Sequence, residues 1–261
     1  YHRAASAVDR HGRGDLPLPL ASGLMARHAV LRTGPAQALP CPATYVACDV
    51  TDDDAPARIR AHVEAHHHGR LTLLVNNAGA SWRGTFAEGG HANVQRTMEL
   101  NFDAVVRVTE ALLPLLRASA PSALVNVAST ASRVSRPGAG AYSASKFALA
   151  GWTDALHAEE LPHGVHVGMV LPGFIATEGF PAEELKAKPH TRWMVSTPDK
   201  VAEAIVDAGP GGRAERYVPR AYGLAAVLRI VAPALTRRAM TGGAGQLATT
   251  KTGADAADRA G

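Results

Sequence analysis

The chain has 261 residues, of which 46% are hydrophobic and 19% are charged, and its formal net charge is +4. This composition is typical of a single globular domain and excludes a disordered chain. The positive charge comes from scattered arginines and not from a basic stripe with interleaved aromatics, so no nucleic-acid partner is expected. The two cysteines, Cys41 and Cys48, provide no disulfide framework. We therefore expect a reducing compartment and a cytoplasmic location.

No stretch reaches the roughly 18 to 20 apolar residues that a membrane span requires. The opening residues, Tyr-His-Arg, are not followed by the apolar region of a secretory signal. Because the chain opens with Tyr1 and not with Met, the sequence is compatible with a fragment of a longer protein.

Residues 1 to about 40 show little helical or strand periodicity, and a regular pattern of apolar residues begins from His28. We expect a poorly ordered segment at 1–27, one domain at 28–241 and a disordered tail rich in Gly, Ala and Thr at 242–261. The pattern predicts strands at 28–32, 44–50, 71–75, 123–128, 166–171 and 216–219. It predicts helices at 54–68, 91–118, 142–161 and 199–208.

This alternation of strands and helices implies right-handed βαβ units and an open parallel sheet with helices on both faces. Continuous apolar runs such as LTLLV at 71–75 are typical of strands that are buried on both sides. Polar residues follow four of these strands, and ligands of such sheets bind outside the carboxyl ends of the strands. We therefore expect one site that brings together Asp49, the Asn-Asn-Ala-Gly run at 76–79, Ser129, and Pro172-Gly173.

Tyr142 and Lys146 are four residues apart at the start of a predicted helix, so their side chains share one face. A nearby ammonium group favours the phenolate form of a tyrosine and makes it a better acid or base near neutral pH. Ser129 would lie across from them and hold a substrate oxygen. Taken singly, each residue has a plainer explanation: an exposed helix pair for Tyr142 and Lys146, and a loop-anchoring hydroxyl for Ser129.

Asn101 lies inside an amphipathic predicted helix, between Leu100 and Phe102. Asparagine is a poor helix former because its side chain competes for backbone hydrogen bonds. It either points to solvent or marks a local kink where a freed carbonyl group binds water.

Together these positions resemble the short-chain dehydrogenase/reductase family over residues 28 to 220. The matching elements occur in the family order: NNAG at 76–79, Asn101, Ser129, YSASK at 142–146, and PGFIAT at 172–177. The resemblance implies a single-domain α/β fold, a Rossmann-like doubly wound parallel sheet in three α/β/α layers. It also implies a homodimer or homotetramer and hydride transfer between a nicotinamide cofactor and an alcohol or carbonyl compound.

The resemblance also implies roles for individual residues. Tyr142 would be the general acid/base, Lys146 would lower its pKa and bind the nicotinamide ribose, and Ser129 would position the substrate oxygen. Asn101 would hold a water that links Lys146 to solvent. The remaining cofactor contacts would come from Asp49 and Val50 at the adenine, from Asn76, Ala78 and Gly79 near the ribose, and from Pro172, Gly173, Ile175 and Thr177 at the carboxamide side.

The sequence departs from the family at its N-terminus, where members carry a strand followed by TGxxxGxG for the pyrophosphate. The first forty residues contain no such motif, and Gly12 and Gly14 form an isolated Gly-Arg-Gly. An altered reading frame upstream of about residue 25, or a diverged or truncated N-terminus, would each explain the loss. In the second case the sheet would lack its first strand and have an unfilled central place.

Cofactor preference depends on the end of the second strand, where a basic residue suits a 2′-phosphate and an acidic one a free 2′-hydroxyl. Arg32 follows the apolar run HAVL, which favours NADP over NAD. The alternative is a solvated surface arginine.

Three further features bear on ligands. His66, His67 and His68 splay around a helix, so a solvated helix end is favoured over a metal site, and no metal is expected. The apolar, arginine-edged segment 220–240, interrupted at Pro233, would enclose substrate, form a subunit interface or contact a membrane surface; we favour the first. Phe180, Trp193 and Met194 fall after PGFIAT, where the resemblance implies a mobile substrate lid. They indicate an apolar substrate, or else they only pack the lid.

The sequence therefore predicts an oxidoreductase that interconverts an alcohol and a ketone or aldehyde with NADP(H) or NAD(H). The alternative is a catalytically silent relative that has lost dinucleotide binding and serves as a binding or oligomerisation module. The combination of Asn101, Ser129, Tyr142 and Lys146 favours the enzyme, whereas the missing glycine loop favours the silent scaffold.

Overall fold

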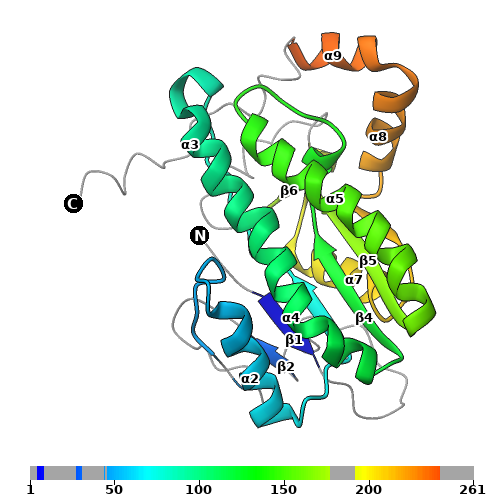
Figure 1. The fold of residues 1–261 in the computed structure, drawn as a ribbon. Helices are drawn as coiled ribbons and strands as arrows, with labels where there is room; N and C mark the ends of the chain where they lie inside the picture. Colours follow the sequence, from blue (N-terminus) through cyan, green and yellow to red (C-terminus); the bar gives the residue numbers. More distant parts are fainter. Residues whose placement is uncertain (1–4, 9–27, 31–43, 45, 177–191, 242–261) are drawn as a thin grey trace.

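A central six-stranded sheet organises the computed structural model, which describes residues 5–8, 28–30, 44, 46–176 and 192–241 (Figure 1). The strand order is β2-β1-β3-β4-β5-β8. The strands are β1 (Ala5–Val8), β2 (His28–Val30), β3 (Leu73–Asn76), β4 (Ser122–Val127), β5 (Val165–Pro172) and β8 (Glu215–Val218). A separate two-stranded pair joins β6 (Phe174–Ile175) to β7 (Val195–Ser196).

The half of the sheet that carries the predicted site is parallel, as the sequence predicts. Strand β3 pairs in parallel with β4, β4 with β5, and β5 with β8. Strand β1 runs antiparallel to both of its neighbours, β2 and β3. The expectation of an unfilled central place is therefore wrong, because β1 occupies it, within the segment 1–27 where the sequence shows no strand period.

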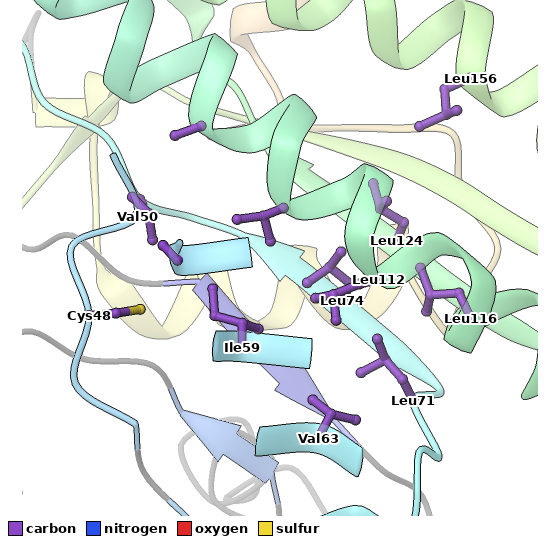
Figure 2. Close-up of a cluster of buried hydrophobic side chains, with 14 of the residues drawn as sticks. Cys48, Val50, Ile59, Val63, Leu71, Leu74, Leu112, Leu116, Leu124 and Leu156 are labelled. Atoms are coloured by element: carbon purple, nitrogen blue, oxygen red, sulfur yellow. The ribbon is translucent and has the colours of Figure 1, made fainter. Parts of the chain in front are cut away.

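Both faces of the sheet are covered by helices, as Figure 1 shows, and successive residues of β3 reach opposite cores. Leu74 packs with Ile59 of α2 (Ala55–His67) and Leu112 of α4 (Ala104–Ala118) in the core of Figure 2. Val75 packs with Ile205 of α7 (Pro198–Ala208) on the other side. This two-sided burial is why the strand reads as a continuous apolar run. The α/β/α layering predicted from the sequence is confirmed.

The helices that build these layers follow the predicted segments closely. They are α2 (Ala55–His67), α3 (Phe86–Met98), the π-helical turn η2 (Glu99–Asp103), α4 (Ala104–Ala118), α5 (Gly140–Glu160) and α7 (Pro198–Ala208). Short 3-10 turns lie at η3 (Thr130–Ser132), η4 (Leu161–His163) and η5 (Arg192–Met194). Helix α3 begins five residues before the predicted start because Thr85 and Glu88 form a capping box, a pattern that is present in the sequence.

The strand predicted over 44–50 is not formed: residues 46–49 are irregular and Val50 lies in a turn. Val46, Cys48 and Val50 nevertheless alternate toward the core that α2, β3 and α4 share. The alternation of apolar residues that suggested a strand therefore reflects side-chain burial without ladder pairing.

The C-terminal segment forms two helices, α8 (Tyr222–Val231) and α9 (Pro233–Thr241), which are separated where Pro233 was expected to interrupt it. Helix α8 leaves large apolar side chains exposed, among them Leu224, Ile230 and Val231. Within the described residues, no helix combines the length and the apolar character that crossing a membrane demands.

Candidate active site

Ser129 and Tyr142 meet at the carboxyl end of β4. Ser129 follows the strand and caps η3, where its hydroxyl accepts a hydrogen bond from the Ala131 amide (3.1 Å) and donates one to the carbonyl of Pro172 (3.3 Å). The Ser129 hydroxyl also shares a hydrogen bond with the phenol of Tyr142. The serine thus links the tyrosine to the end of β5, and the two predicted catalytic hydroxyls are brought together.

The pKa of the Tyr142 hydroxyl is raised from its ordinary value near 10, mainly because the group is buried. The hydrogen bond with Ser129 acts in the opposite direction, as do the positive charges of Arg136 and Arg83. At neutral pH the tyrosine is therefore a protonated phenol, the form that can give a proton to a carbonyl oxygen.

Lys146 lies one helical turn beyond Tyr142 and is buried, with 4% of its surface exposed. Its ammonium group donates a hydrogen bond to the carbonyl oxygen of Val127 at 2.8 Å, and burial lowers its pKa to about 8. Ser129 and two arginines lower the pKa of Tyr142, whereas the lysine donates to Val127 and its nitrogen lies 5.9 Å from the centre of the tyrosine ring. That Lys146 also lowers the pKa of Tyr142 stays a prediction.

Asn101 lies in the π-helical turn η2, which joins α3 to α4, so the predicted helix does contain a local irregularity at this residue. Its side chain is fully buried and makes paired hydrogen bonds with the backbone of Ala80, donating to the carbonyl and accepting from the amide, both at 2.9 Å. It also donates to Ser145 of α5 at 3.0 Å. The amide therefore holds the turn after NNAG against the helix of Tyr142 and Lys146.

The NNAG turn itself is fixed from within the sheet. Asn76 is buried at the end of β3 and donates hydrogen bonds to Thr109 of α4 (3.0 Å) and Asn126 of β4 (2.9 Å). At Gly79 a Cβ atom would lie 3.0 Å from Oδ1 of Asn101 and 3.4 Å from Nζ of Lys146. Glycine thus lets the backbone pass directly beside the lysine, while the neighbouring Ala78 is buried.

The predicted adenine residues lie in the irregular segment before α2. The Asp49 carboxylate accepts hydrogen bonds from the amide and the hydroxyl of Thr51, at 3.0 and 2.7 Å. Val50 has only 3% of its surface exposed and lies in the core.

On the other side, Pro172 ends β5 and Gly173 bonds through its amide to the carbonyl of Val218 at 2.8 Å. Ile175 lies in β6 and packs against the core around α7. Arg32 and Thr177, as well as Phe180 of the predicted lid, lie outside the described residues.

The three consecutive histidines end α2, away from the tyrosine and lysine. His67 shares a hydrogen bond with Thr44 at 2.7 Å, and His66 packs its ring against His62. In the part of the chain that the structure describes, no three metal-binding side chains gather into a group that could hold an ion.

Three residues near Tyr142 were not predicted: Arg136, Phe174 and Tyr222. The guanidinium of Arg136 lies 4.8 Å from the centre of the Phe174 ring. The Tyr222 hydroxyl donates to the carbonyl of Met194 at 3.1 Å, and its ring packs so closely on Gly173 that a Cβ there would be 2.2 Å from it. The sequence offers one indication for Arg136, which is its place within the 13-residue step between Ser129 and Tyr142.

Comparison with known proteins agrees with this geometry. The family model described as short chain dehydrogenase matches residues 26–187, which include the serine, the tyrosine and the lysine. The chain belongs to the short-chain dehydrogenase family.

Among curated members of the family, the ketoacyl reductase HetN of Nostoc sp. is 35% identical over 140 residues, which is 54% of this chain and 48% of HetN. The oxidoreductase SadH of Mycobacterium tuberculosis is 31% identical over 196 residues, 70% of each chain. A short-chain dehydrogenase from Burkholderia cenocepacia, crystallised with NADP, superposes with a TM-score of 0.64 at 28% identity and covers 77% of this chain and 79% of its own. The chain spans about half the length of the first curated relatives that it matches.

Proposed function

We propose that this short-chain dehydrogenase is an oxidoreductase that interconverts an alcohol and a ketone or aldehyde with NADP(H) or NAD(H). The observation that carries the proposal is the hydrogen bond between Ser129 and Tyr142, beside the buried ammonium group of Lys146. A protonated phenol held by a second hydroxyl is what a carbonyl oxygen requires of a general acid.

The residues around Lys146 fit a dinucleotide. The lysine has three N–H donors, and among the described residues it uses one of them on Val127. The other two are available for ribose hydroxyls, and the missing side chain at Gly79 keeps the approach to the ammonium group open. A nicotinamide dinucleotide would supply or accept the hydride when bound.

We assign the remaining cofactor contacts as the family resemblance implies them. Asp49 would accept a hydrogen bond from the adenine amino group and Val50 would pack beside the ring. The turn with Asn76, Ala78 and Gly79 would lie close to the ribose. Pro172, Gly173, Ile175 and Thr177 would line the carboxamide side. Arg32 would bind a 2′-phosphate, and the NADP complex of the Burkholderia relative supports NADP as the preferred cofactor.

Ser129 and Tyr142 have different roles when a carbonyl compound is reduced. Ser129 holds the substrate carbonyl, and Tyr142 gives its proton to the developing alkoxide. Since burial raises the pKa of Tyr142, the proton that reduction consumes is present at neutral pH. We further propose a homodimer or homotetramer, as is usual in the family.

The first test is substitution of the tyrosine. Tyr142→Phe should abolish reduction of carbonyl compounds by NADPH, while the affinity for NADPH, measured by thermal shift, stays nearly unchanged. Cofactor at about a hundred times its dissociation constant adds roughly 2.7 kcal/mol to the free energy of unfolding, which gives a clear rise in melting temperature.

Two results would contradict the proposal. A Tyr142→Phe variant with wild-type turnover would show that Tyr142 is not the general acid. A folded wild-type chain that is stabilised by neither NADPH nor NADH would instead identify the catalytically silent scaffold.

A further inference from the structure

Arg136 is a partly buried cation whose charge acts on the proposed general acid. It lies in the loop between η3 and α5, and its guanidinium stacks over Phe174, the first residue after Pro172-Gly173. Cation–π contacts at such distances are weakly attractive and do not neutralise the charge. The side chain is therefore held against β6 with its positive charge intact.

The surroundings of Arg136 contain another positive charge and two phenols. Its pKa is lowered by burial and by the charge of Arg83, whereas among the described residues Tyr222 and Tyr142 raise it. No carboxylate in the described part of the chain forms an ion pair with it. By contrast, arginines elsewhere in the described part pair with acidic side chains: Arg58, Arg60, Arg107, Arg117, Arg133 and Arg216. A desolvated cation that is not paired with a carboxylate is costly for a fold to keep.

Arg83 is brought to the same place by a backbone contact between two loops. The amide of Gly84 donates a hydrogen bond to the carbonyl of Gly138 at 3.0 Å. This bond joins the loop of Arg83 to the loop of Arg136, and both charges act on the Tyr142 phenol. The two arginines therefore converge on the reacting group from separate parts of the chain.

We propose that Arg136, assisted by Arg83, binds an anionic group of the substrate, a carboxylate or a phosphate, while Ser129 and Tyr142 hold its carbonyl or hydroxyl oxygen. This assignment rests on the proposed function. The planar guanidinium of arginine suits both kinds of anion, because it can present two parallel N–H donors.

Aromatic residues form the apolar side of the same region. Phe174 lies under Arg136, and the rings of Tyr222 and Trp193 pack with their centres 5.7 Å apart. The expected substrate therefore has an apolar part as well as its anion. The apolar substrate expected from the lid sequence is thereby refined to an oxo acid or an oxo phosphate.

The test compares substrates that differ only in the anion. One pair is 3-oxobutanoate and its methyl ester, and the other is dihydroxyacetone phosphate and dihydroxyacetone. For at least one pair, kcat/KM of the wild type should be about tenfold or more higher for the anion, as hydrogen bonds to a charged group allow. The pair that shows the preference distinguishes carboxylate from phosphate.

Arg136→Gln should remove this preference by lowering kcat/KM for the anion about tenfold, while kcat/KM for the neutral partner stays within about twofold. Arg136→Lys should restore part of it. Arg133→Gln is the matched control, because it removes a positive charge from the same loop but one that is paired with Glu215. This control should retain the wild-type preference, and melting curves identify any variant that fails to fold.

Binding separates failure of this assignment from failure of the proposed function. Thermal shift with the product alcohols, 3-hydroxybutanoate and its methyl ester or glycerol phosphate and glycerol, requires no turnover. One outcome is that the anion raises the melting temperature of the wild type but not of Arg136→Gln, in a chain that reduces no carbonyl compound. That result would support the anion site and contradict the proposed dehydrogenase activity. Equal loss of kcat/KM for both members of a pair, or a raised KM for NADPH alone, would overturn the anion site.

Discussion

The ammonium group of Lys146 and the carbonyl oxygen of Val127 lie 2.8 Å apart beneath the NNAG turn. The hydrogen bond fixes a charge where 96% of the residue's surface is withdrawn from water, since only 4% of it is exposed. Burial lowers the pKa of this lysine from 10.5 to about 8, so the folded chain holds the lysine proton less tightly than the unfolded chain does. The function proposed for Lys146 thus opposes the stability of the fold.

Replacing this lysine should therefore stabilise the protein while inactivating it. The displaced pKa corresponds to roughly 3 kcal/mol at neutral pH, and loss of the hydrogen bond to Val127 offsets about 1 to 2 kcal/mol of that gain. We expect Lys146→Met to unfold at a higher denaturant concentration than the wild type at pH 7, by about 1 to 2 kcal/mol in the free energy of unfolding.

The stability difference between the wild type and Lys146→Met should also depend on pH. Because the unfolded chain binds the lysine proton more tightly, the wild type gains stability as pH rises from about 8 toward 10.5, and its difference from Lys146→Met should narrow over that range. Lys200→Met on the exposed side of α7 is the control and should show no such narrowing. A Lys146→Met protein that is less stable than the wild type at pH 7 would show that burial of the charge is not costly.

A second prediction concerns a hydroxyl in the same helix. Ser143 is buried, and its Oγ has no hydrogen-bond partner among the described residues. A buried polar group without a partner loses its hydration without compensation. Ser143→Ala should therefore raise the free energy of unfolding by about 1 kcal/mol, as measured by urea denaturation.

Ser145, two residues further along α5, supplies the matched control. Its hydroxyl donates to the carbonyl of Tyr142 at 2.9 Å and accepts from Asn101 at 3.0 Å. Ser145→Ala should lower stability by about 1 to 3 kcal/mol, because the buried Asn101 amide loses an acceptor. Equal effects of the two substitutions would mean that hydrogen-bond satisfaction does not distinguish them.

The sequence predicts most of the parallel half of the sheet because its strands are buried on both faces. Such strands are visible in the sequence as local runs of apolar residues. Strands β3, β4 and β5 each appear as a largely apolar run, and the helix of Tyr142 and Lys146 follows from its own period. Local patterns do not identify the neighbours of a strand. They give neither the antiparallel place of Ala5–Val8 between β2 and β3 nor the absence of pairing at 46–49.

The candidate site divides in the same way. Ser129, Tyr142 and Lys146 are recognisable from type and spacing, because their chemistry depends on both. The position of Arg136 depends on tertiary contacts, namely the bond from Gly84 to Gly138 and the ring of Phe174. Its spacing from Tyr142 alone does not indicate which way it turns.

A third prediction contrasts two glycines with opposite surroundings. In β5, a Cβ added to Gly168 would lie 1.9 Å from the carbonyl oxygen of Ala208 at the end of α7. Backbone atoms cannot move aside as a flexible side chain can, so Gly168→Ala should separate α7 from the sheet. The expected loss is about 3 kcal/mol or more in the free energy of unfolding.

Gly151 in α5 is exposed, and a Cβ there would meet no heavy atom within 4 Å. Alanine is the better helix former, so Gly151→Ala should raise stability by about 0.5 to 1 kcal/mol. Both variants are compared with the wild type by thermal and urea denaturation. A Gly168→Ala protein of normal stability would show that α7 does not press on β5 as closely as the structure places it.

The last prediction concerns an ion pair between the end of α4 and the end of α5. Arg117 donates two hydrogen bonds to Glu160, at 2.8 and 2.7 Å, and the glutamate is buried with 1% of its surface exposed. The hydrogen bond from Arg117 is the main reason that the pKa of Glu160 lies below its ordinary value of 4.5. Arg117→Gln leaves a buried carboxylate without its cation and should lower the midpoint of urea denaturation at pH 7.

The difference between Arg117→Gln and the wild type should shrink in acid. A carboxyl whose pKa is lowered in the folded state contributes stability above its unfolded pKa and loses it as pH falls through the folded value. Below about pH 4 the wild type therefore loses the benefit of the pair, while the variant has little of it to lose. Adding Glu160→Gln to Arg117→Gln should recover part of the stability at pH 7, since the uncompensated charge is gone. If the single and double variants denature at the same midpoint, Glu160 is not held as an ion, and the connection between α4 and α5 relies on packing alone.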